Sequence, residues 1–132
     1  MKLKLLKIMI LTLLTVNLAA NEIPDLKKGE LLYKSGKYEE AIEHFEKLEE
    51  KVKDSSVLYL WIARSYMANI NNVSFFTKGM YSSSIQNNLK LSIEKDPKNV
   101  EARIFLAQYK FNAPSIGGGD KEEAWKQAEE IA

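Results

Sequence analysis

Apolar residues recur every three or four positions along most of the chain beyond residue 20, which is the spacing of amphipathic α-helices. The clearest stripe lies in segment 38–53 and consists of Tyr38, Ala41, Ile42, Phe45 and Leu48. Glu and Lys fill most positions between them, as on a solvated helix face. Segment 57–68 differs, because it is apolar on almost every side. That pattern predicts a helix enclosed between other helices.

Further helices are predicted on both sides of these two. One covers 26–34, one contains Ile85, Leu89 and Ile93 and ends before Pro97, one covers 100–111, and the last begins at Asp120. Gly36 suits the turn after the first helix, and Asp54, Ser55 and Ser56 offer oxygens to cap the helix that follows them. Asp120 and Glu123 have the spacing of a capping box. The chain is therefore predicted to be all-α.

The first twenty residues have the order of a secretory signal peptide. Segment 1–7 carries three lysines and no acid, segment 8–20 is nearly all apolar, and small Ala19 and Ala20 precede polar Asn21. We expect a signal peptide over 1–20 and a mature domain over 21–132, exported to the periplasm or secreted. The rival interpretation is an uncleaved helix that anchors the protein in the inner membrane, although the apolar run is shorter than the ~20 residues of a spanning helix. The chain has no cysteine, which excludes a cysteine-linked lipid and disulfides.

Two parts of the chain repeat each other at a fixed distance. Small Gly29 and Ala63 are 34 residues apart, and so are Leu32 and Tyr66. A period of this length is typical of helix–turn–helix repeats, which stack to bury a shared core and leave a concave face for a partner.

The residues at these positions resemble the tetratricopeptide-repeat (TPR) family. The matching residues are Gly29, Ala41 and Phe45 in the first unit, Tyr59, Ile62, Ala63, Tyr66 and Pro97 in the second, and Leu106, Ala107 and Ala124 in the third. Arg103 and Lys110 stand where the third unit should have aromatic residues. The resemblance implies a right-handed superhelix of about three helix pairs, with units at about 22–55, 56–99 and 100–132. The second unit is lengthened by an insertion in 69–84, and the last unit is short.

Composition and motifs argue against an enzyme. His44 is the single histidine, and its neighbours Glu43 and Glu46 do not complete a metal-ligand set. The glycines at 117–119 precede a helix but lack the Lys and Ser or Thr of a phosphate-binding loop. We therefore expect no catalytic residue, no cofactor and no metal.

Charge also limits the classes of partner. The formal net charge is +1, and removal of the three leader lysines would leave a slightly acidic domain. This balance predicts no binding to nucleic acid, and no membrane association after signal cleavage.

The resemblance implies that the first helix of each pair lines the concave face. The residues expected to bind a partner there are Tyr33, Leu60, Arg64, Met67, Gln108 and Phe111. Arg64 is the one cation in an otherwise apolar helix, so it is expected to grip a partner's carboxylate, unless it only pairs with a neighbouring Glu. The leading hypothesis is an exported scaffold for a protein or peptide partner.

A second hypothesis uses the 69–84 insertion. Phe75, Phe76, Met80 and Tyr81 would either lengthen the second helix and pack on the stack, or cover a ligand. In the latter case the chain would be a periplasmic small-ligand-binding or transport accessory protein. A deep closed cavity would favour that function, and an open groove would favour a protein or peptide.

The C-terminal end has an apolar face with no following helix in this chain. Trp125 and Ile131 belong to the last predicted helix, and terminal repeats need a polar outer face for solubility. We therefore expect self-association through this end, or continuation in a longer array.

Export can be tested by mass spectrometry of the native protein. We expect a mature N-terminus at or near Asn21, because small Ala19 and Ala20 directly precede it at the end of the apolar run, although Leu18, three places before the cut, is larger than signal peptidase prefers. Recovery of intact Met1 from the membrane fraction would instead support an uncleaved anchor.

Overall fold

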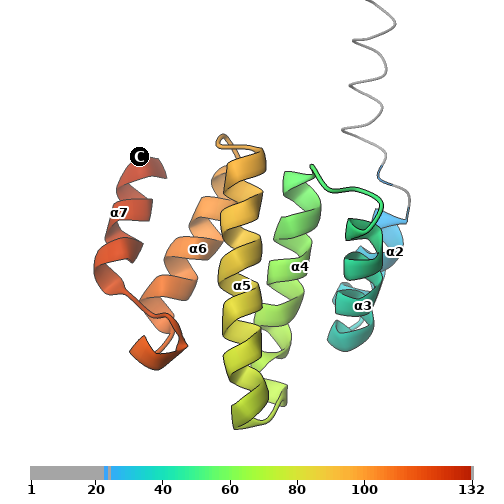
Figure 1. The fold of residues 1–132 in the computed structure, drawn as a ribbon, viewed down its shortest axis with the longest axis horizontal. Helices are drawn as coiled ribbons and strands as arrows, with labels where there is room; N and C mark the ends of the chain where they lie inside the picture. Colours follow the sequence, from blue (N-terminus) through green and yellow to red (C-terminus); the bar gives the residue numbers. More distant parts are fainter. Residues whose placement is uncertain (1–22, 24, 132) are drawn as a thin grey trace, which may run out of the picture.

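The computed structural model describes residue 23 and residues 25–131, and its secondary structure there is entirely helical (Figure 1). The α-helices are α2 (Leu26–Lys34), α3 (Tyr38–Glu49), α4 (Ser56–Asn69), α5 (Phe75–Lys95), α6 (Val100–Asn112) and α7 (Lys121–Ile131). Two short 3₁₀ helices, η1 (Ile70–Asn72) and η2 (Ser115–Gly117), lie in the connections. The all-α prediction is confirmed for this part of the chain. The predicted signal peptide lies outside the described residues.

Consecutive helices pack against each other and are joined by short connections (Figure 1). Gly36 has a φ of 76° and makes the turn from α2 to α3, a conformation that glycine adopts without strain. Of the three candidates before α4, Ser55 is the cap, and its hydroxyl accepts from the Leu58 N–H at 3.1 Å. An Asp120 oxygen accepts from the Glu123 N–H at 3.0 Å, but the Asp120 N–H donates to the Lys110 carbonyl at 2.8 Å, so only half of the predicted capping box is present. The α3 helix ends earlier than residue 53, because the Lys51 and Val52 N–H groups turn back to the Leu48 carbonyl.

The α4 helix contributes to two separate parts of the core. One of its faces packs with α3 in a cluster made of Ala41, Phe45, Leu48, Leu58, Tyr59 and Ile62. Its other face packs with α5 and α6 in a cluster made of Leu60, Ala63, Ile85, Leu89, Ala102, Leu106 and Tyr109. The enclosed position predicted for segment 57–68 is therefore confirmed.

A buried polar network joins the start of α4 to the end of α5. The Ser56 hydroxyl donates to the Ser92 carbonyl at 2.6 Å, and the Ser92 hydroxyl donates to the Ser56 carbonyl at 2.7 Å. Asn99, the N-cap of α6, donates to the Ser56 hydroxyl at 2.9 Å and accepts from the Ala102 N–H at 3.1 Å. Because these polar atoms are mutually satisfied, the backbones of α4 and α5 can approach closely without leaving buried groups unpaired.

The 69–84 insertion lengthens the second helix of its pair. The Ser74 hydroxyl caps α5 by accepting from the Thr77 N–H at 3.3 Å, and α5 then runs for 21 residues. Its N-terminal end extends beyond the neighbouring helices at the bottom of the view (Figure 1). Of the alternatives left open by the sequence, these residues do lie within a longer helix, but Phe75, Phe76 and Met80 do not pack on the stack, because all three are largely exposed.

The predicted register of the third unit is wrong by one residue. Ala102, Leu106 and Tyr109 form the buried stripe of α6, and Ala107 is only half-buried. The buried aromatic residue of this helix is Tyr109, one position before Lys110, where the repeat pattern expects an aromatic residue. Apolar residues lie at both registers, which differ by one residue, and both have helical spacing. The pattern alone could therefore not place the buried stripe of this helix.

None of the helices in the described part of the chain has both the length and the hydropathy that crossing a membrane requires.

The packing of α2 on α3 depends on the absence of a side chain at Gly29. A Cβ built there would lie 2.2 Å from the Phe45 ring. The ring has little freedom to move, because Phe45 is fully buried and stacks on Trp61 with centroids 5.7 Å apart. Gly79 in α5 is a natural control, because a Cβ there meets no atom within 4 Å.

We expect Gly29→Ala to lower the free energy of unfolding by about 1–2 kcal/mol, since overpacking outweighs the gain in helix propensity. Gly79→Ala should raise it by about 0.5–1 kcal/mol, since only the propensity changes. Urea denaturation of both variants measures the difference. A stabilising Gly29→Ala would contradict the tight contact with Phe45.

Candidate functional site

An apolar pocket of about 600 Å³ opens between the C-terminal end of α4, the first turns of α5 and the end of α6. Met67 and Ile70 line it from the α4–η1 side, and fully buried Ile85 contributes from α5. Phe75 and Phe76 of α5 line it as well, and Ile116 of η2 belongs to the connection that follows α6. These three residues are 74%, 88% and 89% exposed, so the pocket is open to solvent along its rim.

The connection between α6 and α7 is fixed by α5 and α6. Pro114 follows α6, and the Tyr109 hydroxyl donates to the Gly117 carbonyl at 2.5 Å. The Lys110 ammonium donates to the Gln86 side-chain oxygen at 2.8 Å and to the Gly118 carbonyl at 3.0 Å. Lys110 therefore ties the connection to α5, and Ile116 is held at the pocket as part of a defined turn.

The glycines at 117–119, for which the sequence argued against a phosphate-binding loop, have a structural role in this connection. Gly118 has a φ of 86°, in the left-handed region. A Cβ at Gly119 would lie 1.8 Å from the Ala113 carbonyl oxygen. The sharp turn back toward α7 therefore requires glycine at both positions.

Polar groups line the pocket beside the apolar residues. The side-chain amides of Asn71, Gln108 and Asn112 are exposed at the pocket, and Lys78 is the one charged residue among its lining residues. Gly79 also belongs to the lining, and a side chain there would enter open space. The pocket thus combines a large apolar area with a few polar groups, the usual composition of a binding site.

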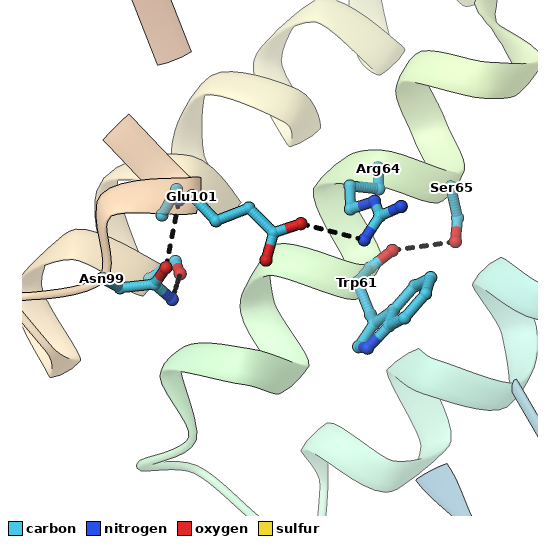
Figure 2. Close-up of polar contacts among 7 residues, drawn as sticks. Trp61, Arg64, Ser65, Asn99 and Glu101 are labelled. Carbon is cyan, nitrogen blue, oxygen red and sulfur yellow. Dashed lines mark hydrogen bonds and ion pairs between the residues drawn. The ribbon is translucent and has the colours of Figure 1, made fainter. Parts of the chain in front are cut away.

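Arg64 lies at a different place, where α2, α4 and α6 approach each other. Its guanidinium carbon is 4.3 Å from the ring centroid of Trp61, 5.1 Å from that of Phe105 and 5.3 Å from that of Tyr33. Figure 2 shows Arg64 reaching from α4 toward Glu101 of α6, with Trp61 below it. The Arg64–Glu101 ion pair measures 3.3 Å.

Stacking on aromatic rings decides where the Arg64 side chain lies. Its Nε is buried and has no hydrogen-bond partner within the described residues, so hydrogen bonding alone does not account for its position. The Glu101 carboxylate is more than half exposed, which weakens the ion pair through solvent screening. Arg64 therefore holds three helices together, and its guanidinium is less free to grip a partner than the sequence suggested.

The six residues predicted to bind a partner do not form one surface. Tyr33 and Arg64 belong to the aromatic cluster just described, whereas Met67 and Gln108 line the pocket. Phe111 is half-exposed outside the pocket lining, with the Lys121 ammonium 5.4 Å from its ring centroid. Leu60 was placed wrongly on an open face: it is 5% exposed and packs in the core against α5 and α6, because α4 is enclosed on both sides.

Several pocket residues had no signal in the repeat pattern. Asn71 and Lys78 lie in the insertion, and Ile116 lies in a glycine-rich loop. Of the pocket residues outside the expected concave face, Phe75 and Phe76 stood out in the sequence, as part of the basis of the second hypothesis. An isolated apolar residue in a glycine-rich loop, here Ile116, is a weak signal in the sequence. It is the signal that could have indicated this side of the pocket.

The described residues contain no group of three or more His, Cys, Asp or Glu side chains that could hold a metal ion. The single histidine, His44, hydrogen-bonds through Nε2 to the Asp25 carbonyl at 2.7 Å and so ties α3 to the start of α2. Burial, reinforced by a hydrogen bond to Glu46, raises the pKa of Tyr66 above its ordinary value.

Comparisons with protein-family models, curated proteins and solved structures gave no match to this chain. Its function therefore has to be argued from its own geometry.

The role of Arg64 can be separated from that of its ion pair. We expect Arg64→Ala to lower the free energy of unfolding by about 1–2 kcal/mol, because it removes packing and cation–π contacts with three rings. Glu101→Gln should change it by less than about 0.5 kcal/mol, because the carboxylate is largely solvated. Thermal or urea melts of the two variants measure this. Equal losses would show that the ion pair, rather than the rings, holds the cluster.

Proposed function

We propose that this protein is a non-enzymatic binding module that takes an apolar segment of a protein or peptide partner into the pocket between α4, α5 and α6. The observation that carries the proposal is the open apolar pocket of about 600 Å³ with Phe75, Phe76 and Ile116 exposed along it. Exposed apolar residues that gather around one concavity are typical of interaction sites.

The position of the pocket combines parts of both hypotheses from the sequence. Met67 and Gln108 come from the expected concave face, and Phe75 and Phe76 come from the insertion. The openness of the rim favours a macromolecular partner, because small-molecule sites usually bury about 70–90% or more of a drug-sized ligand. An array of helix pairs, as the TPR resemblance implies, would be a suitable rigid support for such a site.

The proposed setting follows from the N-terminal sequence. A basic, then apolar, then small-residue leader supports export to the periplasm or beyond, with an inner-membrane anchor as the alternative. The proposed partner is therefore a protein of the cell envelope or of the exterior. Trp125 on α7 is exposed, so self-association through α7 remains a separate prediction.

The pocket can be filled without disturbing the core. Gly79 lines it, and a Cβ there meets nothing within 4 Å, so Gly79→Leu places an aliphatic side chain in open space while removing a helix-weakening glycine. Gly79→Ala is the matched control, because it has the same effect on the backbone with little added volume.

We expect Gly79→Leu to weaken binding of an envelope partner at least tenfold, about 1.4 kcal/mol, while Gly79→Ala binds like the wild type. Phe76→Ala should also weaken binding by about 1 kcal/mol or more, as for aromatic anchors at interfaces, with little loss of stability because the ring is exposed. The measurement is quantitative mass spectrometry of envelope proteins retained on each immobilised variant, followed by titration calorimetry with the protein identified. Retention that is equal for all variants would place the partner site elsewhere.

A further inference from the structure

The region that forms the pocket is unusually poor in negative charge. Between Asp54 and Glu94 the chain carries no acidic residue, and its charged side chains there are Arg64, Lys78 and Lys90. This stretch includes all of α4 and nearly all of α5. The eighteen acidic residues of the whole chain therefore lie outside it, and the one charged residue among those lining the pocket, Lys78, is basic.

Lys78 is the cation placed to act on an occupant. Arg64 is committed to Glu101 and its aromatic cluster, and Lys90 is not among the residues that line the pocket. Lys78 lines the pocket from the first turns of α5, and none of the ion pairs formed within residues 25–131 involves it. A carboxylate on an occupant would meet a positive charge there with no internal acid competing for it.

The amides of α6 suit an extended peptide backbone. Gln108 and Asn112 both line the pocket and are four residues apart on one helix, so they lie on the same face with a rise of about 6 Å between them. In an extended chain, backbone groups that face the same way recur every two residues, or about 6.6 Å. Each side-chain amide offers both a donor and an acceptor, as a peptide group does. A lipid tail would cover these amides without providing hydrogen bonds, which costs free energy.

On these grounds, and resting on the proposed function of this same pocket, we propose that its occupant is an extended peptide segment with a large apolar side chain and an acidic residue beside it. The apolar side chain enters the pocket over Met67 and Ile85. The acidic residue lies at Lys78, and the peptide backbone runs along Gln108 and Asn112. The site is thus specific for a short linear motif.

A random peptide library displayed on phage tests the motif while the partner is still unidentified. The full mature chain is immobilised as wild type, Lys78→Glu, Lys90→Glu and Gly79→Leu. On the wild type we expect enrichment of peptides that carry a large apolar residue within a few positions of Asp or Glu. Lys78→Glu should shift the enriched charge to Lys or Arg, because the residue opposite has changed sign. Lys90→Glu, an exposed change on the same helix outside the pocket lining, should leave the acidic preference intact.

Affinities of one enriched peptide make the test quantitative. By fluorescence anisotropy we expect Lys78→Glu to raise Kd at least about tenfold and Lys90→Glu to raise it less than about twofold, because surface charges away from the contact are screened. Gln108→Ala and Asn112→Ala should each raise Kd about fivefold, because each removes hydrogen bonds to the peptide backbone. N-methylation of the peptide backbone should lower its affinity for the wild type. It should not change its affinity for a double variant that carries both Gln108→Ala and Asn112→Ala, because that variant no longer has the amides that bind the backbone.

The outcomes separate this inference from the proposed function. Enriched peptides without an acidic preference, or a preference that Lys78→Glu does not change, would overturn the motif while leaving the pocket as a binding site. If no peptides are enriched on the wild type relative to Gly79→Leu, the proposal that the pocket binds a peptide is overturned. A fluorescent fatty acid that binds saturably to the wild type, but not to Gly79→Leu, would then assign the pocket to a lipid. If neither probe binds and envelope retention is equal for all variants, the proposed function fails too.

Discussion

Both parts of the core depend on the burial of α4 on two opposite faces. Phe45 and Ile62 belong to the cluster on the α3 side, and Ala63 and Leu89 belong to the cluster on the side of α5 and α6. Between Leu58 and Ser65 only Trp61 and Arg64 are partly exposed, so contacts on both sides of the helix are needed to remove its apolar surface from water. The Ser56–Ser92–Asn99 network then sets how closely α5 and α6 approach its first turn. The positions of the other helices follow from these contacts.

The pocket exists because α5 is longer than the helices that pack beside it. Its capped N-terminal end extends past α4 and α6, and the aromatic residues there find no neighbouring helix to cover them. The turn held by Lys110 and Gln86 brings Ile116 to the same pocket. Such exposure is a cost for a protein without a partner, because it keeps apolar surface in water. The proposed partner would remove this cost by covering the site, and Lys78 is the charged residue among the lining residues that such a partner would meet.

Arg64 illustrates why a charged residue in an apolar helix does not by itself mark a binding site. From sequence it looked like an isolated cation directed outward. In the fold, three rings from three helices surround it, and Glu101 of α6 supplies a partly solvated counter-charge. Its long side chain contributes packing as well as charge, so it stabilises the array in which the pocket is found.

The sequence by itself determined the helices, the capping residues Ser55 and Asp120, the turn at Gly36 and the enclosed position of α4. These depend on local periodicity and on hydrogen bonds within a few residues, which the order of amino acids encodes directly. It also indicated that Phe75 and Phe76 were unusual. Only the tertiary structure decided which face of α6 is buried, that Leu60 is core, and that Ile116 and Lys78 meet at one pocket with Gln108. Those facts depend on how helices distant along the chain pack together, and a period of 3.6 residues fixes a stripe on each helix without fixing what it faces.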